Sequence, residues 1–154
     1  MKISGILLII ASLIFIISGC KKEDESGSTT MVSQHNETES HNNGKPCQSC
    51  HASGGSGKGW FGVAGSVYTQ SMASANANGN IFLFSGPNGT GNLVATIEID
   101  GKGNFYTTGY SIPATGVYAQ VKGTSGSVQN MSPMVTSGNC NACHGVSTEK
   151  IWVN

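Results

Sequence analysis

The sequence contains the pentapeptide Cys-x-x-Cys-His twice, at residues 47–51 and 140–144. Two thiols at this spacing can add to the two vinyl groups of one porphyrin, and the adjacent histidine then lies under the iron. The pattern therefore predicts two covalently bound haem c groups and electron chemistry. The predicted attachment residues are Cys47, Cys50, Cys140 and Cys143, and the predicted proximal iron ligands are His51 and His144.

Two other chemistries use paired cysteines. A lone Cys-x-x-Cys can form a local disulfide or supply half of a zinc site. A zinc ribbon places its two cysteine pairs about 15–20 residues apart, whereas these pairs stand near opposite ends of the mature chain. The histidine that directly follows each pair favours haem attachment over both alternatives.

Each haem iron also accepts a sixth ligand or leaves that position open. The remaining histidines, His35 and His41, lie upstream of the first motif and are candidate distal ligands, as are Met131 and Met134 before the second motif. The alternatives are solvated histidines in a polar segment and methionines that pack in the core or on the porphyrin. The choice sets the reduction potential, because Met/His ligation raises it and bis-His ligation lowers it.

The N-terminus has the composition of an export signal. A positively charged start precedes an aliphatic run at residues 6–17, which is short for a membrane span and suits the core of a signal peptide. The run ends in Ile17-Ser18-Gly19-Cys20, which resembles the lipobox of bacterial lipoproteins. That resemblance implies cleavage before Cys20 and acylation of its thiol. The alternative is an uncleaved anchor helix.

These features predict the organisation and location of the chain. Residues 1–19 are expected to be a lipoprotein signal peptide, 20–45 an acylated cysteine and a flexible polar tether, and 46–154 the haem-bearing domain. The charged run 21–25 resembles the surface-export signal of some Gram-negative lipoproteins, and the alternative is a solvated start of the tether. We therefore expect an outer-membrane lipoprotein, held by its lipid anchor and facing the periplasm or the cell surface. Nucleic-acid binding is not expected, because the chain has no Arg and no net charge.

The globular part has a β pattern. The 22 glycines and the low share of charged residues, 10%, are typical of a turn-rich exported β protein. Alternating or apolar segments recur at the spacing of a β-sandwich. We expect a mainly β fold: a small antiparallel β-sandwich of six or seven strands flanked by two haem-binding segments. Six strands between the motifs would bring both motifs to one end of it. The expected strands are 61–68, 81–84, 93–99, 104–108, 116–121 and 127–135.

Residues 63–121 resemble the carboxypeptidase regulatory-like, or transthyretin-like, β-sandwich. The matching elements are Gly65-Ser66-Val67, the Asp-Gly-Lys-Gly-Asn-Phe hairpin at 100–105 and Tyr118-Ala119-Gln120-Val121. This resemblance implies a scaffold rather than an activity. In its two Cys-x-x-Cys-His motifs the chain is similar to small dihaem c-type cytochromes, which implies electron transfer.

The leading hypothesis is thus an electron carrier and not an enzyme. Such a carrier would exchange electrons with redox partner proteins or an extracellular acceptor, or pass them along a homo-oligomer or filament. An iron with an open position would instead make a haem-based sensor of small ligands or a peroxidase-like enzyme. The third alternative is a surface β-sandwich that serves as a binding module.

Overall fold

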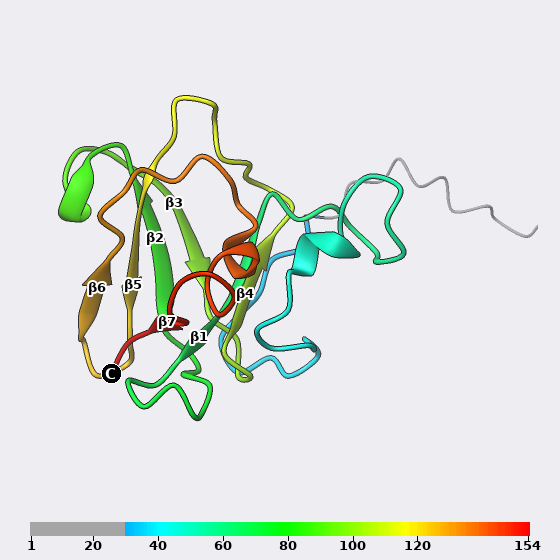
Figure 1. The fold of residues 1–154 in the computed structure, drawn as a ribbon, viewed down its shortest axis with the longest axis horizontal. Helices are drawn as coiled ribbons and strands as arrows, with labels where there is room; N and C mark the ends of the chain where they lie inside the picture. The colour runs from blue at the N-terminus through cyan, green and yellow to red at the C-terminus, as the bar shows by residue number, and fades with distance from the viewer. Residues whose placement is uncertain (1–29) are drawn as a thin grey trace, which may run out of the picture.

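A computed structural model describes residues 30–154 of the chain. Two sheets, with strand orders β4-β1-β7 and β3-β2-β5-β6, pack into a sandwich (Figure 1). The prediction of a small, mainly β sandwich is confirmed. The strands are β1 (Val63–Tyr68), β2 (Asn80–Phe84), β3 (Leu93–Glu98), β4 (Asn104–Thr107), β5 (Tyr118–Lys122), β6 (Val128–Asn130) and β7 (Ile151–Trp152), and the 3-10 helices are η1 (Cys47–Ser49), η2 (Pro87–Gly89) and η3 (Cys140–Ala142).

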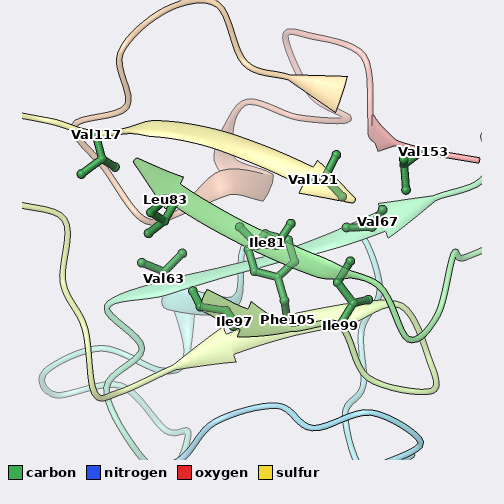
Figure 2. Packing of buried hydrophobic residues seen from close by; sticks show 10 residues of the cluster. All are labelled: Val63, Val67, Ile81, Leu83, Ile97, Ile99, Phe105, Val117, Val121 and Val153. Atoms are coloured by element: carbon green, nitrogen blue, oxygen red, sulfur yellow. The ribbon is translucent and has the colours of Figure 1, made fainter. Parts of the chain in front are cut away.

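The core lies between the two sheets. Alternate residues of the strands point inward, so that Ile81 of β2 faces Ile97 of β3 and Val121 of β5 in register. Phe105 of β4 is the largest fully buried side chain, and it closes the core from the opposite sheet. Figure 2 shows the cluster, which comprises Val63, Val67, Ile81, Leu83, Ile97, Ile99, Phe105, Val117, Val121 and Val153.

The turn from β3 to β4 carries the chain from one sheet to the other. The buried Asp100 carboxylate accepts hydrogen bonds from the N–H groups of Lys102 (2.8 Å) and Asn104 (3.0 Å). Gly103 has a φ of +82°, which favours glycine. The Asp-Gly-x-Gly sequence therefore forms the turn for which its residues are suited.

Two strands differ from the expectation. The segment expected as a strand over 127–135 forms only β6, after which a single bridge joins Val135 to Val117. β7 was not predicted, because two residues are too few to show a period. It pairs in parallel with the end of β1.

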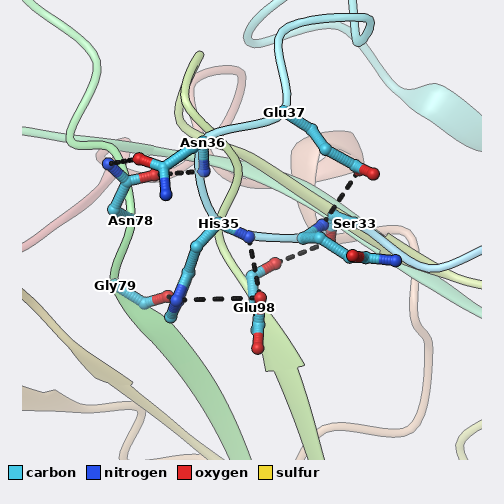
Figure 3. Close-up of polar contacts among 8 residues, drawn as sticks. Ser33, His35, Asn36, Glu37, Asn78, Gly79 and Glu98 are labelled. Atoms are coloured by element: carbon cyan, nitrogen blue, oxygen red, sulfur yellow. Dashed lines mark hydrogen bonds and ion pairs between the residues drawn. The ribbon is translucent and has the colours of Figure 1, made fainter.

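The N-terminal segment 31–45 packs on the sandwich, where a flexible tether reaching residue 45 was expected. Val32 bridges to Thr107 at the edge of β4. Ser33 is fully buried, and its N–H donates to the carbonyl oxygen of Tyr106 (3.0 Å). The Ser33 hydroxyl donates to the carbonyl oxygen of Glu98 (2.6 Å) (Figure 3). The sequence did not indicate this packing because hydrogen bonds hold the segment on the sandwich, and hydrogen bonds do not require periodic apolar residues.

The other N-terminal predictions lie outside the described residues. They are the signal peptide 1–19, the acylated Cys20 and the part of the tether before residue 30. Within residues 30–154, no helix is both long and apolar enough to cross a membrane.

Docking of the segment predicts a stability effect. Ser33→Ala removes the hydroxyl that donates to Glu98 and accepts the N–H of Tyr106 (3.0 Å), so the free energy of unfolding should fall by about 1–3 kcal/mol. Urea unfolding measures the change, with the exposed Ser53→Ala as the control. Equal midpoints for the two variants would mean that residues 31–45 do not pack on the domain in solution.

Candidate functional site

The two Cys-x-x-Cys-His motifs have the same local structure. Each forms a short 3-10 helix, η1 or η3, in which the histidine N–H donates to the carbonyl oxygen of the first cysteine. That bond is 3.0 Å from His51 to Cys47 and 3.0 Å from His144 to Cys140. All four cysteines of the motifs are free thiols. The arrangement leaves both thiols and the imidazole of each motif available to one ligand.

Both motif histidines are held through the same ring nitrogen. Nδ1 of His51 lies 2.9 Å from the carbonyl oxygen of Lys58, and Nδ1 of His144 lies 2.8 Å from that of Glu149. Because a carbonyl can only accept, Nδ1 carries the hydrogen in this network and Nε2 keeps its lone pair. A bond of this kind fixes the tautomer and orientation of metal-binding histidines. Both rings are thus prepared to ligate through Nε2.

Stacked aromatic rings support the first histidine. The His51 ring lies parallel to that of Phe61, with centroids 4.1 Å apart, and Phe61 stacks on Tyr106 at 4.7 Å. Gly57 passes so close that a Cβ there would lie 2.7 Å from Nδ1 of His51. The absence of a side chain at this position therefore makes room for the imidazole of His51. Trp60, next in sequence to Phe61, points into solvent and is 64% exposed.

The first motif opens onto a cleft of about 220 Å³, which also contains His41. The ring centroids of His41 and His51 are 6.0 Å apart. Two imidazoles bound at about 2.0–2.1 Å on opposite sides of one metal ion have centroids about 6 Å apart. The spacing of these two rings therefore fits a pair of axial ligands. The predicted candidate His41 is brought to the motif by the segment expected to be a free tether.

The second motif opens onto a larger cleft of about 620 Å³, within the usual range for ligand pockets. Core side chains, including Leu83 and Phe105, form part of its wall, so this cleft reaches between the two sheets. Met131 and Met134 also line it, and Met134 is 47% exposed. The structure thus brings both candidate methionines to the second motif. His144 is the one histidine among the residues that line this cleft.

His35 lies away from both clefts. Its Nε2 is 2.9 Å from the carbonyl oxygen of Gly79, and its Nδ1 is 3.7 Å from a carboxylate oxygen of Glu98 (Figure 3). The Gly79 carbonyl accepts a hydrogen from Nε2, so this nitrogen has no free lone pair for a metal. His35 therefore helps to dock the N-terminal segment and is not placed as a distal ligand.

The two motifs lie beside each other along strand β1. The main chain before the second motif forms a parallel bridge from Asn139 to Ala64 on the edge of β1. The side chain of Asn141, inside the second motif, donates to the carbonyl oxygen of Lys45, just before the first motif (3.0 Å). Six strands separate the two motifs, as expected. The motifs are close together, but they lie along β1 rather than at one end of the sandwich. The sequence did not predict this contact of Asn141, because an asparagine beside a cysteine belongs to no motif that would indicate its partner.

Burial changes the acidity of the first cysteine of each motif. Cys140 packs against the core, and desolvation, with a smaller contribution from the nearby Cys47 thiol, raises the pKa of Cys140 to about 12. Burial also raises the pKa of Cys47. Both groups are therefore neutral thiols at pH 7 in the folded chain without a bound group.

The donor set fits haem c better than a bare metal ion. Within residues 30–154, no three His, Cys, Asp or Glu side chains are grouped so as to hold a metal ion. A haem iron asks the protein for only one or two axial ligands, and each motif offers two thiols and one oriented imidazole beside a cleft. No family model, curated protein or solved structure matches the chain.

The raised pKa of Cys140 predicts alkaline instability of the protein without haem. Above pH 9 the unfolded thiol loses its proton while the folded one keeps it, so stability falls as the pH rises toward 12. The contribution of this thiol is up to about 1.4 kcal/mol per pH unit. Urea unfolding at pH 8 to 11 should show a weaker pH dependence for Cys140→Ala than for wild type. Cys143→Ala, which removes an exposed thiol, is the control, and equal slopes for all three proteins would contradict the prediction.

Proposed function

We propose that this chain is an exported dihaem c-type cytochrome that carries electrons. One observation carries the proposal: both motifs place two free thiols beside a histidine whose Nδ1 is bound to a main-chain carbonyl. Haem bound in this way supplies one-electron iron chemistry. In this proposal, the thiols of Cys47 and Cys50, and those of Cys140 and Cys143, hold one haem each.

The axial ligands would differ between the two sites. His51 and His41 would serve the first site, as their 6.0 Å spacing suggests. His144 would serve the second, with Met131 or Met134 opposite it in the cleft. A bis-His site has a lower potential than a Met/His site, so the first haem would be the stronger reductant. Filled axial positions favour electron transfer over ligand binding.

The location and partners belong to the same proposal. An acylated Cys20 would anchor the chain to the outer membrane, and redox proteins would meet it from the periplasm or from outside. The first site offers an obvious contact, because the exposed Trp60 lies next in sequence to Phe61, which stacks on His51. Aromatic side chains of this kind are enriched where proteins associate. The open edge strand β3, with Leu93 and Val94 exposed, supports self-association of the chain.

The test is to count haem and to record spectra of protein matured with a haem-attachment system. Wild type should carry two haems, and the pairs Cys47→Ala/Cys50→Ala and Cys140→Ala/Cys143→Ala should each carry one. Both haems should be low-spin and unreactive toward carbon monoxide. Protein without haem would overturn the proposal, and a high-spin haem that binds carbon monoxide would favour a sensor or a peroxidase-like enzyme.

Replacing His41 tests the first site alone. His41→Ala should leave two haems attached, because the thiols remain, but one of them should become high-spin and bind carbon monoxide. The matched control is His35→Ala, which removes a docking hydrogen bond worth about 1 kcal/mol and should leave the spectra unchanged. If His35→Ala opens an iron and His41→Ala does not, the assignment of the sixth ligand is wrong.

A further inference from the structure

Asn141 belongs to the second motif, but its side chain serves the first. It is 1% exposed and does not line the second cleft. Its Nδ2 donates to the carbonyl oxygen of Lys45 (3.0 Å) and to the hydroxyl of Ser66 (3.1 Å), and its Oδ1 accepts the N–H of Ser66 (3.2 Å). All of its bonds thus go to strand β1 or to the chain that enters the first motif.

The hydrogen bonds continue from β1 to the segment around His41. The Ser66 hydroxyl accepts the N–H of Gly44 (2.9 Å) and donates to Oδ1 of Asn104 (2.6 Å). Nδ2 of Asn104 in turn donates to the hydroxyl of Ser40 (2.9 Å) and to Oδ1 of Asn43 (3.2 Å). Ser66 and Asn104 are 1% and 3% exposed, so the hydrogen bond between them is shielded from water. The bonds to Gly44, Ser40 and Asn43 are partly shielded.

We call Asn141, Ser66 and Asn104 the buried polar network. It holds residues 40–45, which contain no regular strand or helix. The imidazole of His41 is exposed and forms no hydrogen bond with any residue in 30–154, so its position depends on the residues beside it. An unpaired buried polar group costs about 1–3 kcal/mol, which is why the network favours a single placement of this segment.

We propose that Asn141 is a positioning residue that couples the two motifs, because it holds the His41 segment over the first cleft from within the second motif. The inference rests on the proposed function, in which His41 is the sixth ligand of the first site. A substitution that displaces Asn141 within the second motif then weakens the hydrogen bonds that hold the His41 segment. The coupling is reciprocal, so opening of the His41 segment also weakens the packing of the second motif.

The test uses the two-haem protein and carbon monoxide. Asn141→Ala should retain both haems and raise the fraction of reduced haem that binds carbon monoxide at least severalfold. Asn141→Asp keeps the size of the side chain but replaces the Nδ2 donor by an acceptor that faces the carbonyl oxygen of Lys45. Its fraction of reduced haem that binds carbon monoxide should therefore be at least as large as that of Asn141→Ala. In the double variant with His41→Ala, the effects should not add, because both changes open the same iron.

A matched control separates positioning from loss of stability. Nδ2 of Asn76 donates to the carbonyl oxygen of Val153 (2.6 Å), and neither residue lines either cleft. Asn76→Ala should reduce stability without opening an iron. Should Asn141→Ala fail to fold, Asn43→Ala removes an exposed side chain that accepts a hydrogen bond from Asn104 of the network, and it should produce the same spectral change to a smaller extent. If no network variant changes carbon monoxide binding while His41→Ala does, the inference is wrong and the proposed function stands.

A second measurement does not depend on haem. Amide hydrogen exchange at Gly44 and Ser66 in the haem-free protein should be about tenfold faster in Asn141→Ala than in wild type or Asn76→Ala. If matured protein carries no haem, the proposed function fails, and this measurement alone decides whether Asn141 holds residues 40–45. Unchanged exchange at both amides would overturn the inference whatever the haem content.

Discussion

Strand β1 is the shared support on which the two motifs depend. All six of its residues are buried, and β4 lies along one edge while the second motif and β7 share the other. The packing is close at Gly65, where a Cβ would lie 2.6 Å from the Phe105 ring and 3.0 Å from Cβ of Cys140. A larger residue at position 65 would therefore displace either Phe105 of the core or Cys140 of the second motif. The packing of the core and the position of the second motif thus both depend on this one residue.

The parts of the structure that sequence analysis predicted are those with a short-range signal. Alternating apolar residues, or a short apolar run in the case of β2, predicted the positions of β1 to β5, and Asp-Gly-x-Gly predicted the turn at 100–103. Both motifs were recognisable from spacing alone. Residue types within ten positions of one another were sufficient in each of these cases.

The parts that were missed depend on contacts between distant residues. Docking of 31–45 uses the Ser33 hydroxyl and main-chain groups of β3 and β4, more than 60 positions away. The orientation of each motif histidine comes from a main-chain carbonyl, which any residue could supply. That His41 lines the first cleft and His35 does not follows from where the docked segment lies, and composition could not have distinguished the two histidines.

The two clefts place different demands on the fold. The first is small and lies against residues 39–51 and strand β4, whereas the second is lined by the core residues Ile81 and Leu83. Phe105 lines both clefts. A flat apolar group in the second cleft would extend the core itself. This difference gives the second site a structural role that the first site does not share.

The docked N-terminal segment also limits how far the domain could stand from an anchor at Cys20. A chain of free residues to position 45 would have allowed a wide range of positions above a surface. With residues 31–45 fixed to the sheets, only the ten residues between Cys20 and Met31 could span the gap, and a fully extended chain of that length reaches about 35 Å. A lipid on Cys20 would therefore hold the edge of β4 within one membrane thickness of the bilayer surface, and the exchange of electrons would take place close to that surface.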